Sequence, residues 1–478
     1  MMKVIVIGAG FTGLQLAKSL IAEDRDVVLI EKDPLKVRHA RNSLDCTIIE
    51  GDGNNPDTLF EAGLSSANAL VTLTDDDEIN MITCSLVDDD HPDILKIARV
   101  RNYAYYVNTS IARRKRDEKN QNQSIRPLFG IDVMLNPEVE TSKAISSAVA
   151  HGAIGNIIKL GDNHVITSLL VEEDSDIANK PIKKLAEIPE WKFIVAYVET
   201  KEGATLPGGE TVLKPGDHIG VLLNINDLPN LAKISGAKNV SAINSIAVFG
   251  ADRVGMLVAE RLLAEGKNSA FAQVAKEQRP AKLELSIVDR DASRCKEATE
   301  HFENATVLCG DITDSDLISE ESLDKSDLMV AASGNFDSNL VIAAYFKSRG
   351  VKRTIALTSS SEFNDVANKL GIDVAIPMRD TVVDAVLSHL RGKNVKSIHS
   401  VCNRTFEIIE CGIDEGSKAA GKTLSKMAAK GQFLALLVRR ENEENFSIPN
   451  GETLLQAGGR IVMIIKGGDN RTIRLFCR

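Results

Sequence analysis

The stretch Val4-Ile5-Val6-Ile7-Gly8-Ala9-Gly10-Phe11-Thr12-Gly13 decides the fold of this 478-residue chain. Its first four residues are all β-branched and predict a buried strand, and its glycines, spaced Gly-x-Gly-x-x-Gly, predict a tight turn. An amphipathic segment from Leu14 to Ala22 predicts the helix that follows. Strand, glycine turn and helix in this order begin a sheet of the dinucleotide-binding type.

Each glycine of the motif has a different expected role. Gly8 permits the tight turn, Gly10 lets the backbone approach a pyrophosphate, and Gly13 lets the helix pack on the strand. Glu31 closes the next strand, where a carboxylate accepts hydrogen bonds from both ribose hydroxyls and repels a 2′-phosphate. The motif therefore favours NAD(H) over NADP(H), the alternative being that Glu31 only solvates the end of a strand.

Short apolar runs alternate with helical stretches through the rest of this region. The alternation is typical of βαβ units, so we expect an α/β fold with a Rossmann-like, doubly wound parallel sheet. The expected strands are 4–7, 27–30, 47–50, 69–73 and 94–98, and the expected helices are 14–22, 35–44 and 80–87.

Further polar residues follow these strands, at the edge where ligands bind in such sheets. Asp52 follows the third strand, Thr74-Asp75-Asp76-Asp77-Glu78 follows the fourth, and Arg99 and Arg101 follow the fifth. The acidic cluster is interpreted either as a metal site or as a solvated helix N-terminus, which the helix dipole favours. Arg99 is expected to pair with a phosphate as a bidentate donor.

The chain contains two copies of this design. The glycine motif returns 242 residues later as Gly250-Ala251-Asp252-Arg253-Val254-Gly255, and Pro207-Gly208-Gly209-Glu210-Thr211 returns at the same offset as Pro449-Asn450-Gly451-Glu452-Thr453. Two unrelated motifs with one offset indicate that a two-domain unit was duplicated. We call residues 1–242 the first half and 243–478 the second half.

The composition of the chain disfavours several classes of binding partner and of cellular location. The formal net charge of −10 disfavours nucleic acid and anionic membrane surfaces as main partners. The seven cysteines are scattered without a Cys-x-x-Cys pair, which supports neither a disulfide framework nor a zinc site and fits a reducing cytoplasm. No apolar run approaches the ~20 residues that span a bilayer, and the N-terminal apolar run is too short for a signal peptide. We expect no direct membrane insertion.

The motifs together resemble a known family. The glycine motif, Glu31, Asp52, Thr74 with Asn80, and Ile131-Asp132 followed by Pro137 are similar to the RCK, or KTN, domain of potassium transport regulators. The smaller module resembles the RCK C-terminal domain, a small α+β fold, through Asn179-Lys180-Pro181 and the motif Pro207-x-x-x-Thr211-x-x-x-Pro215-Gly216-Asp217. The tandem order, with both domains present twice, resembles the peripheral subunits of Trk-type potassium uptake systems.

The resemblance implies a regulator rather than an enzyme. Such a protein lies in the cytoplasm, peripheral on the inner face of the cell membrane, as a homo-oligomer (dimer or tetramer) beneath a membrane potassium transporter of the Trk type. It controls potassium uptake according to bound NAD(H), with ATP or ADP as the other candidate ligand. Carried over residue by residue, the implied cofactor-binding set is Gly8, Ala9, Gly10, Phe11, Thr12, Gly13, Glu31, Asp52, Thr74, Asp75 and Arg99, with no catalytic and no metal-binding residues.

Domain boundaries follow from the same comparison of motifs. The expected segments are 1–136 for the first RCK N-terminal domain, 137–153 for a crossover helix, 154–232 for the first C-terminal domain, 243–376 for the second RCK N-terminal domain, 377–395 for a second crossover helix and 396–478 for the second C-terminal domain.

The second half departs from the pattern at positions that would touch a ligand. The positions of Gly10, Asp75 and Arg99 are occupied in the second half by Asp252, Gly334 and Leu357. In contrast, Asp289, Asp311 and Asn339 stand at the positions of Glu31, Asp52 and Asn80. Two like charges at ~4 Å and an effective dielectric constant near 20 repel by about 4 kcal/mol, so a carboxylate beside a pyrophosphate opposes binding. The second half is therefore interpreted as structural, or as binding another ligand.

The crossover segments 138–150 and 380–390 both read as single helices. Val382, Val383, Val386, Leu387 and Leu390 form an apolar stripe in the second one. The stripe predicts either ordinary core packing or the interface between RCK domains that the resemblance implies. His389, beside the stripe, is expected to be a packing or capping residue rather than a metal ligand.

The first half is longer than the second between Arg101 and Asp132 and carries the basic run Arg113-Arg114-Lys115-Arg116 there. The run is interpreted as a solvated loop, or as a contact with an acidic partner loop or lipid headgroups.

Two other functions stay open. A dehydrogenase needs a proton-transfer residue facing the nicotinamide, and the modules 154–231 and 396–478 offer no evident His, Tyr-Lys or Cys catalytic set. A structural assembly protein would bind nucleotide without changing conformation.

Overall fold

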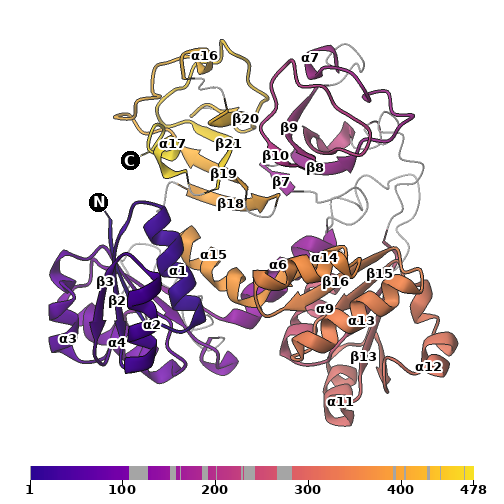
Figure 1. Ribbon diagram of the computed structural model, residues 1–478, viewed down its shortest axis with the longest axis horizontal. Helices are drawn as coiled ribbons and strands as arrows, with labels where there is room; N and C mark the ends of the chain where they lie inside the picture. Colours follow the sequence, from indigo (N-terminus) through magenta and orange to yellow (C-terminus); the bar gives the residue numbers. More distant parts are fainter. Residues whose placement is uncertain are drawn as a thin grey trace. The chain divides into compact units, whose positions relative to one another are not determined.

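A computed structural model of the chain describes residues 2–106, 128–150, 158–161, 163–185, 192–200, 202–227, 230, 243–265, 283–390, 395–402, 405–427, 431–441, 443–467 and 469–477. The chain divides into two compact units (Figure 1). The N unit comprises Met1–Ser147 and Asn244–Leu390, and the C unit comprises Ala148–Ile243 and Arg391–Arg478. Each unit thus combines one segment from each half. The basic run 113–116 lies outside the described residues.

The first half of the N unit contains a six-stranded parallel sheet in the order β3-β2-β1-β4-β5-β6. The strands are β1 (Lys3–Ile7), β2 (Asp26–Glu31), β3 (Thr47–Glu50), β4 (Ala69–Thr72), β5 (Leu95–Arg99) and β6 (Val133–Leu135), and the helices are α1 (Phe11–Ala22), α2 (Pro34–Ser43), α3 (Pro56–Glu61) and α4 (Asp77–Asp90). The chain reverses direction across the sheet at β1 and β4. The predicted doubly wound parallel fold is confirmed.

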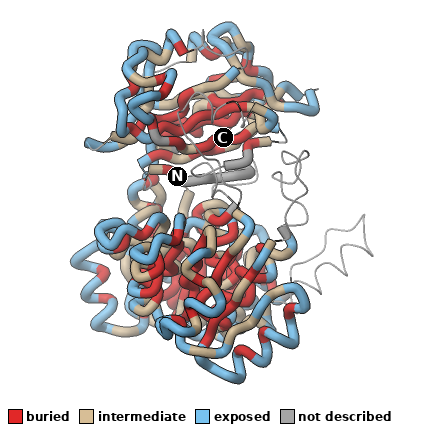
Figure 2. Tube along the Cα trace, turned by 90° about the vertical axis from the view of Figure 1, so that its right-hand side faces the viewer, coloured by how far each residue is buried: buried red, intermediate tan, exposed pale blue. Residues whose placement is uncertain are grey.

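The second half repeats this sheet in the order β14-β13-β12-β15-β16-β17. Its strands are β12 (Ser245–Phe249), β13 (Glu284–Asp289), β14 (Thr306–Cys309), β15 (Leu328–Ala331), β16 (Arg353–Thr358) and β17 (Val374–Pro377). Its helices are α9 (Arg253–Glu265), α11 (Ala292–His301), α12 (Ser315–Glu320), α13 (Phe336–Ser348) and α14 (Asn364–Lys369). In both sheets the central strands carry the buried residues (Figure 2).

The crossover helix of the second half, α15 (Met378–Leu390), packs into the core of the first half. Its stripe, Val382, Val383, Val386, Leu387 and Leu390, belongs to one buried cluster with Val4, Val6, Leu16 and Leu20 of the first half. Helix α15 therefore lies along α1 (Figure 1). The stripe is core packing and contact between the two nucleotide folds of one chain at the same time, so the two interpretations of it do not exclude each other.

The crossover helix of the first half, α6 (Pro137–Ala150), contacts the second half in turn. The Arg261 guanidinium Nε donates a hydrogen bond to Ser142 Oγ at 3.0 Å, and the hydroxyls of Thr141 and Thr381 lie 3.2 Å apart where α6 meets α15. Ile145 of α6 is fully buried. The two nucleotide folds have thus exchanged crossover helices.

The C unit contains two small antiparallel sheets, with orders β10-β9-β11-β8-β7 and β18-β19-β21-β20. The elements of the first are β7 (Ile158–Leu160), β8 (His164–Leu170), α7 (Ile182–Leu185), β9 (Phe193–Thr200), β10 (Gly203–Thr205) and β11 (His218–Asn224). Those of the second are β18 (Val395–Val401), β19 (Phe406–Gly412), α16 (Leu424–Met427), β20 (Phe433–Arg439), β21 (Arg460–Lys466) and α17 (Asn470–Ile473).

The motif at residues 207–211, which is repeated at 449–453, forms the same turn in both halves. Thr211 Oγ1 accepts a hydrogen bond from Gly208 N, and Thr453 Oγ1 accepts one from Asn450 N, each at 2.9 Å. The carbonyls of these threonines then accept from the amides at the start of α7 and α16. The motif is therefore explained by the turn that it builds. Among the described residues no helix is both long and apolar enough to cross a membrane.

Candidate nucleotide-binding site

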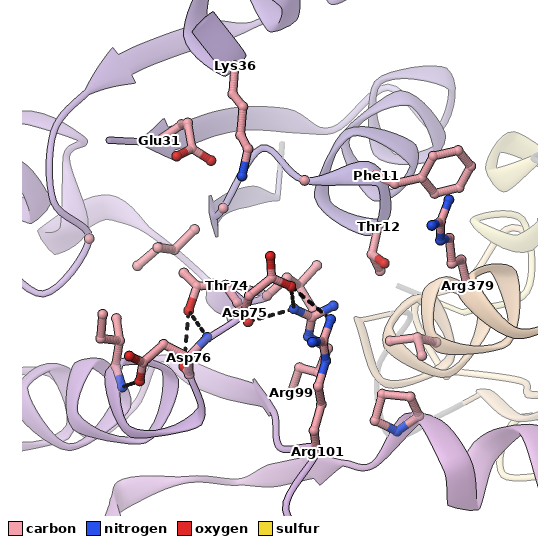
Figure 3. Close-up of a pocket in the computed structure, with 18 of the residues that line it drawn as sticks. Phe11, Thr12, Glu31, Lys36, Thr74, Asp75, Asp76, Arg99, Arg101 and Arg379 are labelled. Atoms are coloured by element: carbon pink, nitrogen blue, oxygen red, sulfur yellow. Dashed lines mark hydrogen bonds and ion pairs between the residues drawn. The ribbon is translucent and has the colours of Figure 1, made fainter. Parts of the chain in front are cut away.

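A cavity of about 650 Å³ lies at the carboxyl ends of β1, β2, β3, β4 and β5 in the N unit (Figure 3). Nine of the predicted site residues line it: Gly8, Gly10, Phe11, Thr12, Glu31, Asp52, Thr74, Asp75 and Arg99. The other two, Ala9 and Gly13, lie behind its wall. The cavity therefore brings together residues that the sequence places at the ends of five different strands, because these strands end at one edge of the sheet.

The glycine turn has the geometry that its three glycines predict. Gly8 has a φ of +102°, which favours glycine, and a Cβ on Gly13 would lie 1.9 Å from the carbonyl oxygen of Gly8. A Cβ on Gly10 would meet nothing within 4 Å, so the space over Gly10 is open. Helix α1 begins at Phe11, three residues before the predicted start, and no side chain caps it. Its first amides are left as donors for an anion at the cavity.

Glu31 holds the turn from the side of β2. The carboxylate is only 8 % exposed and accepts hydrogen bonds from Ala9 N at 2.6 Å and from the amides of Lys32 and Asp33, both at 2.9 Å. Ala9 therefore serves the site through its amide, which positions Glu31, rather than by facing the cavity. A buried carboxylate with three backbone donors is not a solvated strand end, so that alternative is wrong.

Asn80 of α4 joins the loops that follow β4 and β5. Its Oδ1 accepts from the amide of Thr74 at 3.0 Å and from the Thr74 hydroxyl at 2.7 Å, and its Nδ2 donates to the carbonyls of Thr74 and Arg99. The side chain is fully buried. Asn80 thus fixes the spacing between Thr74 and Arg99 without touching the cavity.

The acidic cluster is the start of α4. Asp76 is the N-cap, and its carboxylate accepts from Ile79 N at 2.9 Å, while Asp77 accepts from the amides of Arg101 and Asn102. The helix N-terminus interpretation of the cluster is thereby confirmed. Among the described residues no group of three or more His, Cys, Asp or Glu side chains is arranged to hold a metal ion.

Asp75 bridges two arginines at the cavity wall. Its Oδ1 lies 2.9 Å from Arg99 Nη2 and 2.8 Å from Arg101 Nη2 (Figure 3). Partial burial raises the pKa of the Asp75 carboxyl, but the Arg101 and Arg99 guanidiniums outweigh it and leave the pKa below its usual value. Arg99 is only 6 % exposed, and within the part of the chain that the structure describes its Nε has no hydrogen-bond partner. Arg99 therefore retains a buried donor for an anionic group.

Four cationic residues that line the cavity, Lys32, Lys36, Arg101 and Arg379, were missing from the predicted site set. Arg101 follows the same strand as Arg99, and Lys36 lies in the first turns of α2. Arg379 comes from α15 of the second half (Figure 3). Proximity to the end of β2 or β5 is the sequence signal for Lys32, Lys36 and Arg101. No spacing in the sequence points to Arg379, because its position depends on the exchange of crossover helices.

The second half builds the same turn and fills it with Asp252. Gly250 has a φ of +104°, and Ala251 N donates to Asp289 Oδ2 at 2.8 Å, as Ala9 does to Glu31. Asp252 accepts from Gly255 N at 3.3 Å and also from the backbone of Gly334. Burial raises the pKa of Asp252. Its carboxylate takes backbone donors of the turn that a phosphate would use in an intact motif.

The scaffold around the second turn is otherwise retained. Asn339 Oδ1 accepts from Ser333 N at 3.0 Å, and its Nδ2 donates to the carbonyls of Ser333 and Leu357. These bonds correspond to those of Asn80, with Leu357 at the place of Arg99. The second half keeps the fold of the site and lacks its guanidinium.

Comparison with known proteins agrees with this geometry. The model of the TrkA-N domain matches residues 4–114 and 246–377, which together are half of the chain, and that of the TrkA-C domain matches residues 166–236. The chain belongs to the TrkA-N domain family. Both TrkA-N matches begin in the strand before a glycine turn, β1 in one half and β12 in the other.

Relatives of this TrkA-N protein align along its whole length. The Trk system potassium uptake protein TrkA homolog 1 of Methanosarcina mazei is 29% identical over 472 residues, 97% of each chain. The Trk system potassium uptake protein TrkA of Azorhizobium caulinodans is 24% identical over 480 residues, 100% of this chain and 99% of the relative. The solved GsuK channel bound to NAD has the same fold, with a TM-score of 0.55 and 16% identity, over 98% of this chain and 78% of the channel.

Proposed function

We propose that this chain is a regulatory subunit that binds NAD(H) in its first half and controls potassium uptake through a membrane transporter of the Trk type. The observation that carries the proposal is the cavity at the Gly8–Gly13 turn, which is lined by an open Gly10, an uncapped helix N-terminus and Arg99, whose buried Nε has no partner among the described residues. These groups suit a pyrophosphate, since amides and guanidiniums are its usual partners.

The preference for NAD(H) over NADP(H) rests on Glu31. The carboxylate lines the cavity, and its oxygens are held by the amides of Ala9, Lys32 and Asp33. A 2′-phosphate placed against it would be repelled, whereas a ribose hydroxyl would donate to it. ATP and ADP share the adenosine and the pyrophosphate, so they compete for the same groups.

The regulator assignment draws on the relatives and on what the cavity lacks. Among the described residues that line it, none is a histidine, cysteine or tyrosine that would transfer a proton to or from a substrate. Relatives along the full length are named as potassium uptake proteins, and the fold is shared with the GsuK channel bound to NAD. Regulation requires that the ligand prefer one conformation, typically by 1 to 3 kcal/mol.

The oligomeric part of the proposal follows from the duplication. Two nucleotide folds per chain let a closed ring form from few subunits, and we propose a dimer or tetramer of this chain in the cytoplasm beneath the transporter. Light scattering on the purified protein checks this part. A monomer at micromolar concentration contradicts it.

The binding proposal is tested by titration calorimetry with NADH, NAD and ATP. We expect about one NADH per chain and unchanged absorbance at 340 nm during prolonged incubation, because a regulator binds the dinucleotide without oxidising it. Gly10→Asp, which copies Asp252 into the first half, is the matched variant and is expected to abolish binding. Consumption of NADH would favour the dehydrogenase, and binding that leaves potassium flux unchanged would favour the structural assembly protein.

A further inference from the structure

We propose that Arg379, a residue of the second half, contacts the phosphates of the ligand bound by the first half. The inference rests on the proposed function, since it concerns the same cavity. It adds a ligand contact that comes from outside the nucleotide fold containing the Gly-x-Gly-x-x-Gly motif. One consequence is that the ligand would connect the two halves of the chain directly.

The place of Arg379 is fixed by the packing of α15. Arg379 is the second residue of this helix, and the stripe that begins at Val382 is buried in the core of the first half. The backbone amide of Arg379 also donates to the carbonyl of Ser359 at 3.3 Å. The side chain is therefore carried to the cavity wall by a helix that is anchored on both sides.

The guanidinium lies beside the phosphate-binding turn. Its central carbon is 4.6 Å from the ring centroid of Phe11, which is the first residue of α1 and directly follows Gly10. Figure 3 shows Arg379 entering from α15 beside Phe11 and Thr12. A cation over an aromatic ring is attracted only weakly at an exposed site, so the guanidinium can turn from Phe11 toward an anion.

The charges of the cavity favour Arg379 as a phosphate partner. Arg99 and Arg101 share the carboxylate of Asp75, so a phosphate must compete with an existing ion pair to use their Nη2 atoms. For Arg379, in contrast, the described residues provide no carboxylate within ion-pair distance. Arg379 can therefore take up a phosphate without breaking a salt bridge.

The duplication provides an internal comparison. Asp132 accepts from the amide at the second residue of β5, and Asp373 accepts from the corresponding amide of β16, which aligns the ends of the two halves. Helices α6 and α15 then begin at Pro137 and Met378. Glu138 is thus the counterpart of Arg379.

Glu138 lies near the motif that Asp252 interrupts. The pKa of Glu138 is raised by burial, with Arg253 opposing the rise and Asp252 adding to it, so Glu138 lies within the electrostatic reach of both. Arg253 is the counterpart of Phe11 at the start of its helix, and Glu138 also lines the first cavity, as Arg379 does. The crossover helix that serves the intact glycine motif carries an arginine, and the one that serves the interrupted motif carries a carboxylate. This difference is expected if the arginine serves an anionic ligand.

The test is the affinity of the full-length protein for NADH at several salt concentrations. Arg379→Gln keeps a polar side chain that can donate hydrogen bonds and removes the charge, and we expect it to weaken NADH binding about 10-fold and to reduce the dependence of affinity on salt. Arg379→Lys should recover part of both. Lys369→Ala removes an exposed cation of the same half outside the cavity and is the control.

The outcomes separate this inference from the proposed function. Wild-type affinity and salt dependence in Arg379→Gln would overturn the inference and leave NADH binding by the first half intact. A protein that binds no NADH in the wild type contradicts the proposed function and the inference with it. Equal losses in Arg379→Gln and Arg379→Lys with an unchanged salt dependence would show a packing role and also overturn the inference.

Discussion

The amide of Ala9 donates to Glu31 Oε2 at 2.6 Å, and the corresponding amide of Ala251 donates to Asp289 Oδ2 at 2.8 Å. The second bond is present although Asp252 interrupts the glycine motif beside it. The carboxylate at the end of the second strand therefore has a structural role that does not depend on a ligand. In the first half, ribose recognition by Glu31 would be added to this role.

The matched carboxylates lead to the first prediction. Glu31→Ala and Asp289→Ala should each lower the free energy of unfolding by about 1–3 kcal/mol, because each leaves buried amides without their acceptor. Only Glu31→Ala should also weaken NADH binding. Calorimetric melting and NADH titration of both variants check this. Equal loss of NADH affinity in Asp289→Ala would show that the carboxylate acts on binding only through the fold.

Exchange of the motif residues gives the second prediction. Gly10→Asp should abolish NADH binding in the first half, whereas Asp252→Gly should open a weak second site, measured as stoichiometry above one NADH per chain. Recovery should be partial, because Leu357 stands where the first half has Arg99. If Asp252→Gly binds no additional NADH at millimolar concentration, shape rather than charge closes the second site.

The third prediction concerns the pH dependence of stability. Burial raises the pKa of Asp252 above the ordinary value of 3.8, so the folded protein disfavours the ionised carboxylate. The neutral acid form stabilises the fold at low pH, and this contribution is lost as the pH rises through the folded-state pKa. Asp252→Asn should therefore be more stable than the wild type at pH 8, with the difference disappearing below pH 3.8. Thermal melts of the wild type and Asp252→Asn at both ends of this pH range measure the difference in stability. A lower stability of Asp252→Asn at pH 8 would contradict a raised pKa of Asp252.

The fourth prediction tests the exchanged crossover helix. Leu390 of α15 is 4 % exposed in the core of the first half, so Leu390→Ala should cost about 2–5 kcal/mol of unfolding free energy. Leu370, at the end of α14, is 46 % exposed, and Leu370→Ala should change stability little. Because α15 covers the first half, Leu390→Ala should lower the temperature at which NADH binding is lost. An equal effect of the two variants in urea denaturation contradicts the packing.

The sequence predicts those site residues that lie at the ends of strands in successive βαβ units. Gly8, Glu31, Thr74 and Arg99 meet at one cavity because the carboxyl ends of parallel strands share an edge. Helix α1 begins at Phe11 rather than Leu14, because the glycine turn leads directly into the helix before its apolar periodicity starts.

The parts that do not follow depend on contacts between the halves. The stripe of α15 has the period of any amphipathic helix, which cannot tell its own sheet from the sheet of the other half. The contact between Arg379 and Phe11 depends on which sheet α15 packs against. It therefore cannot be predicted from the spacing of neighbouring residues in the sequence. In the same way, the ion pairs of Asp75 with both Arg99 and Arg101 depend on side-chain geometry, which the sequence does not reveal.

Potassium flux into liposomes that contain a Trk-type transporter and this protein tests the central claim most directly. The measurement compares no ligand, NADH and ATP, for the wild type and for Gly10→Asp, which is predicted to close the cavity while leaving the second half unchanged. We expect NADH to change the flux with the wild type, about 5- to 150-fold for a coupling of 1–3 kcal/mol, and to leave it unchanged with Gly10→Asp. Two results would contradict the claim that the first-half cavity regulates transport. One is a potassium flux that does not change with NADH or ATP in the wild type, and the other is an equal response to NADH in Gly10→Asp.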